Sequence, residues 1–319
     1  MTAQTMEASM SKSEESPYFH EYFASRMQVY KLGAVRPITY QKYKITLRRI
    51  RELAPTLRVS EINKWKYQSL INAYAETHER QTVMDFHNHC RAALLDAIDD
   101  GLLKIDPARK AIIKGKEPAK KRPKFLSLFQ LQAMLQGLEL GHEPSWDWLI
   151  LLAAKTGMRF AEILGLTPSD FDFAQNKVKI SKTWGYKNFE CGFAKTKNES
   201  SKRTISIDPR LAQQMQALVA SLPEDKPIFV GTKRIFNSTA NNRLVALCRR
   251  AGVPEISFHC LRHTHASLLI FAGVSIASIA KRLGHSNITT TQETYLHIIQ
   301  ELEDKDNDKV LTHLGELDR

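Results

Sequence analysis

The stretch of sequence that decides the fold runs SFHCLRHTHASLL (257–269), RLGHSN (282–287) and TQETYLH (291–297). Within it His259, Arg262, His285 and Tyr295 supply two imidazoles, a guanidinium and a phenol. These groups suit an attack on a phosphodiester, because they combine a nucleophile, proton carriers and a fork that fits phosphate. Each histidine taken alone is equally compatible with a helix surface or a satisfied core position.

Two further motifs precede this stretch. TGMRFAEILGL (156–166) places Arg159 just after a Thr-Gly turn, and FAKTKNESSKRTISI (193–207) places Lys195 near the tip of a predicted hairpin. The six candidate catalytic residues, in chain order, are Arg159, Lys195, His259, Arg262, His285 and Tyr295. This order resembles the signature of the tyrosine recombinases, which include the phage and mobile-element integrases and the Xer proteins. The resemblance covers roughly residues 17–319.

The resemblance implies a role for the phenol and the two guanidinium groups. Tyr295 corresponds to the nucleophile, whose attack would form a phosphotyrosyl link to the 3′ phosphate and free a 5′ hydroxyl. Such a link conserves the bond energy, so that a second strand can reverse the step. Arg159 and Arg262 correspond to a clamp on the non-bridging oxygens, since guanidinium forks match phosphate geometry and stay charged.

The remaining three residues correspond to proton carriers and hydrogen-bond donors. Lys195 corresponds to the general acid that protonates the 5′ oxygen, and His259 to a group that assists proton movement at the tyrosine. His285 corresponds to a hydrogen-bond donor to the pentacovalent phosphorane. His263 and His265 are predicted to be packing or surface residues.

The charge balance indicates a polyanionic partner. The chain has 319 residues, enough for two domains, and 43% of them are hydrophobic, which suffices for real cores. Its 46 Lys and Arg outnumber its 34 Asp and Glu, which gives a net charge of +12. We therefore expect duplex DNA, in the form of recombination core sites, as the principal partner.

We expect no metal and no cofactor. The four cysteines show no C-x-x-C pair, and the chain has neither a Walker motif nor G-x-G-x-x-G. HNHC (87–90) superficially suggests metal ligands, but Cys90 falls on an apolar helical face. His259 and His263 have the spacing of a zinc-protease helix, yet Cys260 stands where that motif requires Glu. With no signal peptide and no run of transmembrane length, we expect a cytoplasmic protein without membrane contact.

The pattern predicts a mostly α fold with a small antiparallel β-sheet, of α+β class. After a disordered tail (1–16), residues 17–105 are predicted to form a bundle of four helices, at about 18–31, 39–53, 63–76 and 82–100, with Thr39 capping the second and Trp65 on the inner face of the third. The second of these carries a basic face, on which we expect DNA contacts from Lys42, Lys44, Arg48 and Arg49. The resemblance makes this bundle a core-type DNA-binding domain.

Residues 106–124 are predicted to be a basic linker. The segment has three prolines, and eight Lys or Arg against one acid lie between Arg109 and Lys124. Such a run is compatible with a simple solvated tether. The sharper hypothesis is a strap across the phosphate backbone, with DNA contacts from Lys120, Lys121 and Arg122.

Residues 125–319 are predicted to form the catalytic domain. Ser127 is expected to cap a first helix, a buried helix at 146–154 leads to Arg159, and segments 177–183, 189–194 and 203–207 are expected to form one three-stranded antiparallel sheet. Helices follow from about residue 211. Beyond Tyr295 the resemblance implies a tail exchanged between protomers, which would link four copies into a homotetramer on DNA.

Three functions stay open at this stage. The first is a site-specific recombinase serving the integration or excision of a phage or mobile element, with an excisionase or a host DNA-bending protein as a further expected partner. The second is a Xer-like recombinase that resolves chromosome dimers, and the third is a DNA-binding protein that uses the scaffold without catalysis. A topoisomerase with the same chemistry is a further option. Integrases with similar motifs often carry an additional amino-terminal domain for arm sites, whereas only about sixteen residues precede the first helix here.

Overall fold

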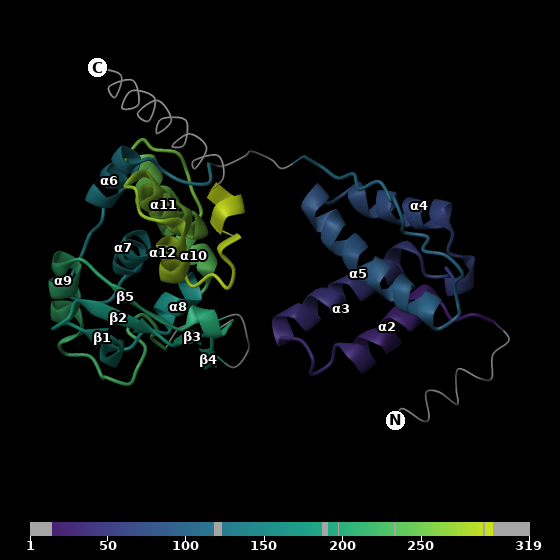
Figure 1. The fold of residues 1–319 in the computed structure, drawn as a ribbon, viewed down its shortest axis with the longest axis horizontal. Coiled ribbons are helices and arrows are strands. Elements are labelled where there is room, and N and C mark those ends of the chain that lie inside the picture. The colour runs from purple at the N-terminus through teal and green to yellow at the C-terminus, as the bar shows by residue number, and fades with distance from the viewer. Residues whose placement is uncertain are drawn as a thin grey trace, which may run out of the picture. The chain divides into compact units, whose positions relative to one another are not determined.

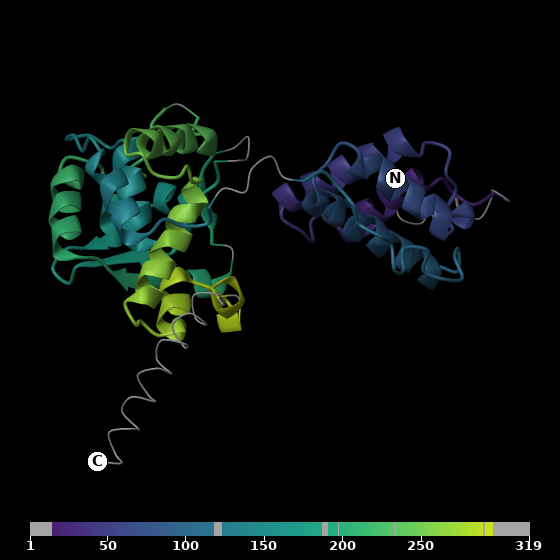
Figure 2. The same cartoon turned by 90° about the horizontal axis from the view of Figure 1, so that it is seen from above.

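The computed structural model describes residues 15–117, 123–186, 191–196, 198–232, 234–289 and 291–295. The chain divides into two compact units, residues 1–121 and 122–319. Lys120, Lys121 and Arg122 of the predicted strap lie outside the described residues, as do most of the predicted amino-terminal tail and the whole segment predicted to be exchanged. As predicted, the fold is mostly helical with small antiparallel sheets (Figures 1 and 2).

The first unit is a bundle of helices. Its elements are α2 (Phe19–Tyr30), α3 (Pro37–Leu53), the 3-10 helix η1 (Val59–Glu61), α4 (Lys64–Ala75) and α5 (Arg80–Asp99). The largest side chains that are fully buried between these helices are Phe19, Phe23, Ile50, Tyr67, Ile71 and Leu94. Burial of this apolar surface is the main force that holds the bundle together.

Two details of the first unit differ from the prediction. Thr39 does not cap α3, which begins instead after Arg36 with Pro37 at its first position, where a missing N–H costs nothing. Trp65 was expected on the inner face of α4 but is 84% exposed. Asn63 caps α4 by accepting hydrogen bonds from the next residues, and the inner face then starts at Tyr67, almost half a helical turn away from Trp65.

The basic face of α3 is present. Lys42, Lys44 and Arg48 are exposed and Arg49 is partly exposed. Arg48 and Arg49 share one carboxylate, Glu52, at 3.8 and 2.7 Å. Exposed ion pairs of this kind contribute little to stability, so both guanidinium groups can exchange Glu52 for another anion.

The predicted linker begins later than expected. Residues 106–117 pack on the first unit: Ala108 is buried, and the Gln68 side chain both donates to the carbonyl of Ile112 and accepts from its N–H, at 2.8 and 2.9 Å. The backbone N–H of Lys116 donates to the carbonyl of His78. Pro107 and Ala108 are buried and Ala111 and Ile113 pack against the core of the bundle, whereas Ile112 is exposed, and the count of charges alone does not reveal this packing.

The second unit has a layer of helices beside short strands (Figure 1). Its helices are α6 (Leu128–Gln136), α7 (Trp146–Thr156), α8 (Phe160–Leu164), α9 (Pro209–Val219), α10 (Asn237–Arg250), α11 (Phe258–Phe271) and α12 (Ile276–Leu283), with the 3-10 helices η2 (Pro168–Asp170) and η3 (Glu199–Ser201). Residues 288–289 and 291–295 are also helical. Ser127 caps α6 in a capping box with Gln130, as predicted from the sequence.

The strands form two sheets, so the prediction of one three-stranded sheet is wrong in its pairing. In the first sheet β2 (Lys177–Ile180) lies between β1 (Phe171–Asp172) and β5 (Arg203–Ser206), all antiparallel. The second pairs β3 (Lys182–Trp184) with β4 (Phe193–Lys195). The chain leaves the first sheet after Ile180 because β3 packs closely on the end of α8, where a Cβ on Gly165 would come within 2.8 Å of the Thr183 backbone.

Helix α7 forms the centre of the second unit. Nearly all its side chains are buried, and the core around it draws on α6, α8, α9, α10, α11 and the first sheet. Its end carries the Thr156–Gly157 turn that leads to Arg159. Among the described helices none is long and apolar enough to cross a membrane.

Candidate active site

Tyr295 lies in the helical segment 291–295 and is only 2% exposed. It packs in a small apolar cluster with Ala266, Ile270, Ile279 and Leu283, so α11 and α12 fix the position of its ring. Burial raises the pKa of its hydroxyl to about 12, although the nearby charge of Arg262 acts in the opposite direction. The phenol is therefore protonated at neutral pH.

The partner of this hydroxyl is His263, which the sequence analysis assigned to packing or surface. A hydrogen bond of 2.9 Å joins the Tyr295 hydroxyl to Nδ1 of His263. Burial, then the neighbouring His259 and Arg262, lower the pKa of His263 to about 4, so the imidazole is neutral at pH 7. A neutral imidazole can accept the phenolic proton.

His259, predicted to assist the tyrosine, lies on α11 one helical turn before His263. Its side chain is exposed, and its ring makes an edge-to-face contact with His263 at 5.0 Å between centroids. Neighbouring protein atoms still remove part of the water from around the ring. This desolvation, followed by the positive charges of Arg262 and Arg159, lowers the pKa of His259. The structure thus inserts His263 between His259 and the hydroxyl of Tyr295.

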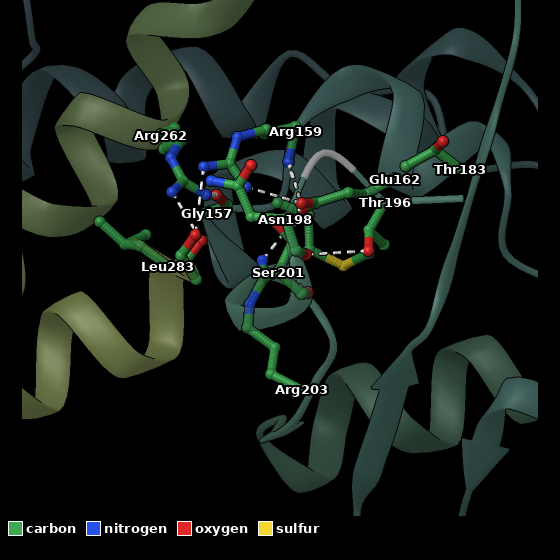
Figure 3. A network of polar contacts seen from close by, with 12 residues as sticks. Gly157, Arg159, Glu162, Thr183, Thr196, Asn198, Ser201, Arg203, Arg262 and Leu283 are labelled. Atoms are coloured by element: carbon green, nitrogen blue, oxygen red, sulfur yellow. Dashed lines mark hydrogen bonds and ion pairs between the residues drawn. The ribbon is translucent and has the colours of Figure 1, made fainter. Parts of the chain in front are cut away.

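Arg262 projects from α11 into the interior and is 4% exposed. It donates from one nitrogen to the carbonyl of Gly157 at 2.8 Å and from the other to the carbonyl of Leu283 at 2.6 Å (Figure 3). Burial, helped by the charge of Arg159, lowers its pKa to about 9. The group is still cationic at neutral pH and pairs with neutral carbonyl oxygens, which a phosphate oxygen could replace.

Arg159 immediately precedes α8 and faces the same end of α12. Its backbone N–H and one guanidinium nitrogen donate to the Glu162 carboxylate at 2.9 and 2.8 Å, and the other donates to the carbonyl of Gly284 at 3.3 Å. With 31% of the side chain exposed, Arg159 is the more accessible of the two predicted clamp residues.

Glu162 supplies a buried carboxylate that the sequence analysis did not single out. It is 2% exposed and forms ion pairs with Arg159 and with Arg203 of β5. Burial alone would raise its pKa, but hydrogen bonds and charge from Arg203, followed by Arg159, lower it below its usual range. Its spacing three residues after Arg159, the capping-box position at the start of a helix, is the signal that could have indicated it.

His285 follows α12 at the turn made by Gly284. Its Nδ1 lies 2.7 Å from the hydroxyl of the buried Thr291, which orients the ring. Burial, followed by Arg262, Arg159 and Arg203, lowers its pKa to about 4. The residue therefore lies close enough to both predicted clamp residues to feel their charge.

Within the described residues, no hydrogen bond or ion pair joins the Lys195 side chain to the other five candidates. It is the last residue of β4, paired in register with Lys182, so it lies at the end of a strand rather than at the tip of the hairpin. Its side chain is exposed, and within the described residues no ion pair or side-chain hydrogen bond engages its ammonium group. Lys182, by contrast, is held by an ion pair with Asp170.

Two glycines allow this close packing. Gly157 has φ +67°, and a Cβ there would come within 2.8 Å of both His265 and Leu283. Gly284 has φ +69°, and its Cβ would come within 2.9 Å of a guanidinium nitrogen of Arg203. Only glycine combines this backbone conformation with the available space.

The arrangement is suited to phosphoryl transfer. Arg159, Arg203 and Arg262 contribute three positive charges and Glu162 one negative charge (Figure 3), which leaves a net charge of +2 in the neighbourhood of the Tyr295 phenol. This positive surplus complements the negative charge on the oxygens around a phosphorus under attack. In the described part of the chain no group of three or more His, Cys, Asp or Glu is placed to hold a metal ion.

A buried tyrosine beside convergent arginines and histidines, on a helical unit with small sheets, defines the class of tyrosine recombinases. The model of the phage integrase family matches residues 124–301. That match covers more than half of the chain, so the chain belongs to the phage integrase family.

Relatives and solved structures agree with this assignment. A XerC-like tyrosine recombinase of Caldanaerobacter subterraneus subsp. tengcongensis is 27% identical over 297 residues, which cover 83% of this chain and 75% of that protein. The integrase of Staphylococcus phage L54a is 30% identical over 166 residues, 47% of each chain.

Among solved structures, the Tn1549 transposon integrase in complex with a circular intermediate DNA is similar with a TM-score of 0.73 and 19% identity, covering 87% of this chain and 94% of that one. A lambda integrase dimer bound to a COC′ core site has a TM-score of 0.68 and 16% identity, covering 90% of this chain and 79% of that one. At this level of identity the similarity establishes the fold.

Proposed function

We propose that this chain cuts and rejoins duplex DNA at specific sites through a 3′-phosphotyrosyl intermediate, and that it serves the integration or excision of a phage or mobile element. The observation that carries the proposal is the hydroxyl of Tyr295, held next to Arg262 in a site with surplus positive charge. Membership of the phage integrase family supports it. We further propose that the protein works in the cytoplasm and needs no cofactor.

In the proposed first step the Tyr295 oxygen attacks the scissile phosphorus and the bond from phosphorus to the 5′ oxygen breaks. The phenolic proton passes to a neutral imidazole, for which His263 is already in hydrogen-bond contact and His259 is its neighbour. Lys195 gives a proton to the departing 5′ oxygen, which requires β4 to bring its exposed ammonium group to the site. Rejoining reverses these transfers.

Arg159 and Arg262 bind the non-bridging oxygens in this scheme. Both donate to backbone carbonyl oxygens, and a phosphate oxygen is a stronger, charge-assisted acceptor. His285, oriented by Thr291, donates to the phosphorane. The buried position of Arg262 means that its guanidinium moves or its surroundings open when DNA binds.

We propose that both units contact DNA. Lys42, Lys44, Arg48 and Arg49 of α3 supply one basic face, and the strap with Lys120, Lys121 and Arg122 remains a prediction of the same kind. Since neutralised phosphates release counterions, binding should weaken steeply with salt.

We also propose that four copies assemble on DNA into a homotetramer through an exchanged carboxyl-terminal tail. An excisionase or a host DNA-bending protein is proposed as a further partner. A lambda integrase tetramer bound to a Holliday junction is among the similar structures.

The test is a covalent-trapping experiment. The chain is incubated without metal or ATP with a library of candidate attachment sites that carry a nick or a bridging phosphorothiolate, beside a Tyr295→Phe control. We expect a protein–DNA adduct that the control lacks. DNA binding by the wild-type chain without an adduct on any duplex would contradict the proposal and favour a non-catalytic DNA-binding protein.

Sequencing the trapped DNA separates the remaining alternatives. A trapped junction of a mobile element supports an integrase, whereas a single chromosomal site with two inverted half-sites supports the Xer-like alternative, for which the XerC-like relative is the specific observation. Relaxation of supercoiled plasmid by a monomer, without a preferred sequence, would indicate the topoisomerase alternative.

A further inference from the structure

Arg203 is a buried arginine outside the six-residue signature. It lies at the start of β5, its side chain is 5% exposed, and within the described residues its guanidinium donates to Arg282, Glu162 and Ser201, which surround the candidate site. A buried guanidinium is costly unless each of its donors finds an acceptor. Its surroundings therefore show which groups it holds in place.

The end of α12 collects three different arginines on three successive carbonyl groups. Arg203 donates from Nε to the carbonyl of Arg282 at 2.6 Å, Arg262 donates to the carbonyl of Leu283 at 2.6 Å, and Arg159 donates to the carbonyl of Gly284 at 3.3 Å. The last carbonyls of a helix lack intrahelical partners and carry partial negative charge. They therefore suit a row of guanidinium groups.

The Glu162 carboxylate joins the same arginines from the other side. The two terminal nitrogens of Arg203 donate to its two oxygens at 3.2 and 2.9 Å, in the fork geometry that only arginine offers, and Arg159 donates to one of the same oxygens at 2.8 Å. Arg203 also donates to the carbonyl of Ser201 at 2.9 Å, which fixes the segment that follows β4. Figure 3 shows Arg159, Arg203 and Arg262 converging on this region.

Glu162 can orient Arg159 without neutralising its charge only while Arg203, a second cation, shares the carboxylate. Without Arg203, the carboxylate would pair with Arg159 alone and reduce the charge that Arg159 offers to a phosphate. The end of α12 would also lose the contact next to the carbonyl that orients Arg262. Both effects act on the direction and charge of the two clamp residues, and neither requires Arg203 to touch DNA.

We infer that Arg203 is a positioning residue for strand cleavage, which holds Glu162 and the end of α12 so that Arg159 and Arg262 point their guanidinium groups at the scissile phosphate. The inference rests on the proposed function, because it presupposes that these two arginines bind that phosphate.

The experiment measures single-turnover adduct formation on the site trapped by the wild-type chain. Each variant is tested on a scissile phosphate and on a neutral scissile methylphosphonate, and its DNA dissociation constant is measured in parallel. The variants are Arg203→Gln, Arg203→Lys, Glu162→Gln and the double variant Arg203→Gln/Glu162→Gln. Arg243→Gln is the matched control, since Arg243 makes the same two-pronged contact with the buried Asp147, away from the candidate site.

We expect Arg203→Gln to slow cleavage of the phosphate about 100-fold or more while DNA affinity changes less than threefold. Arg203→Lys should restore less than a tenth of the lost rate, because a lysine cannot hold both carboxylate oxygens and the two carbonyls. The double variant should be no slower than the slower single variant, since the two residues act as one unit. Arg243→Gln should stay within threefold of wild type.

The ratio of the phosphate rate to the methylphosphonate rate keeps the inference testable even for variants that fold poorly. A loss of folded protein lowers both rates equally, whereas misdirected guanidinium groups lower only the rate on the charged phosphate. An unchanged ratio in Arg203→Lys, or multiplicative losses in the double variant, would overturn the inference and leave the proposed function intact. Absence of an adduct from the wild-type chain would contradict the proposed function itself, and the inference with it.

Discussion

His265 allows a test of how the stability of the second unit depends on pH. The residue is 8% exposed, its Nδ1–H donates to the carbonyl of Ala154 at 3.0 Å, and its Nε2 accepts from Nε of Arg282 at 3.0 Å. The ring therefore donates from one nitrogen and accepts at the other, which only a neutral imidazole can do. Burial, with the charge of Arg282, lowers the pKa of His265 to about 4. A proton on Nε2 would face the Arg282 guanidinium and break this contact.

The sign follows from the number of bound protons. Between pH 6.5 and 4 the unfolded chain carries a proton on this histidine and the folded chain does not, so the free energy of unfolding falls as the pH falls through this window. At pH 5.5 the difference is ~0.9 proton, which corresponds to a slope of ~1.2 kcal/mol per pH unit. The carboxyl groups of Asp147, Glu162 and Asp208, whose pKa values are lowered, lose their stabilising effect only below their usual range near pH 4.

The assay is urea unfolding between pH 5 and 7, followed by tryptophan fluorescence, to which the buried Trp148 of the second unit contributes. His265→Gln should cost about 1–3 kcal/mol at pH 7, because Ala154 and Arg282 lose a matched partner. Its slope against pH should be smaller than that of wild type by ~1 kcal/mol per pH unit. His142→Gln in an exposed loop is the control and should leave the slope unchanged. Equal slopes for wild type and His265→Gln would refute the reasoning.

Two further predictions concern single contacts in the same unit. His263→Ala should slow adduct formation by about 10- to 100-fold because Tyr295 loses the acceptor of its proton. His263→Asn should recover part of this rate. A wild-type rate in His263→Ala would show that the contact is not used in the reaction. Gly157→Ala should destabilise the second unit by about 2–4 kcal/mol, from its positive φ together with the clash with His265 and Leu283, whereas Gly141→Ala, with free space around it, should change the melting temperature little.

The sequence indicated most of the site because the chemistry of a phosphodiester restricts which side chains can act on it. Arg159, Arg262, His285 and Tyr295 converge as their order in the chain implied. The helices of both units could also be predicted, since their apolar residues recur at helical spacing and Ser127 stands in the capping position of α6.

Other features depend on contacts between segments far apart in the chain, which no local pattern encodes. Nothing in RTISI distinguishes Arg203 from a surface arginine at the edge of a strand, because its acceptors come from α8 and α12. The exchange of His259 for His263 at the tyrosine is decided by how α11 rotates against the segment 291–295. The division into two sheets likewise follows from the packing of β3 on α8.

We propose that the Tyr295 phenol becomes reactive only when a phosphate binds beside it. A phenol with a pKa of about 12 is ionised to only ~10⁻⁵ at neutral pH, and the cations that could stabilise a phenolate are engaged with carbonyl oxygens and Glu162. A phosphate that takes Arg159 and Arg262 from these carbonyls would place its own negative charge beside His263, which favours the protonated imidazole. The same event therefore increases the affinity of the acceptor for the phenolic proton and brings phosphorus to the oxygen. On this proposal, removal of the phenolic proton and attack on phosphorus are coupled, because the same bound phosphate promotes both.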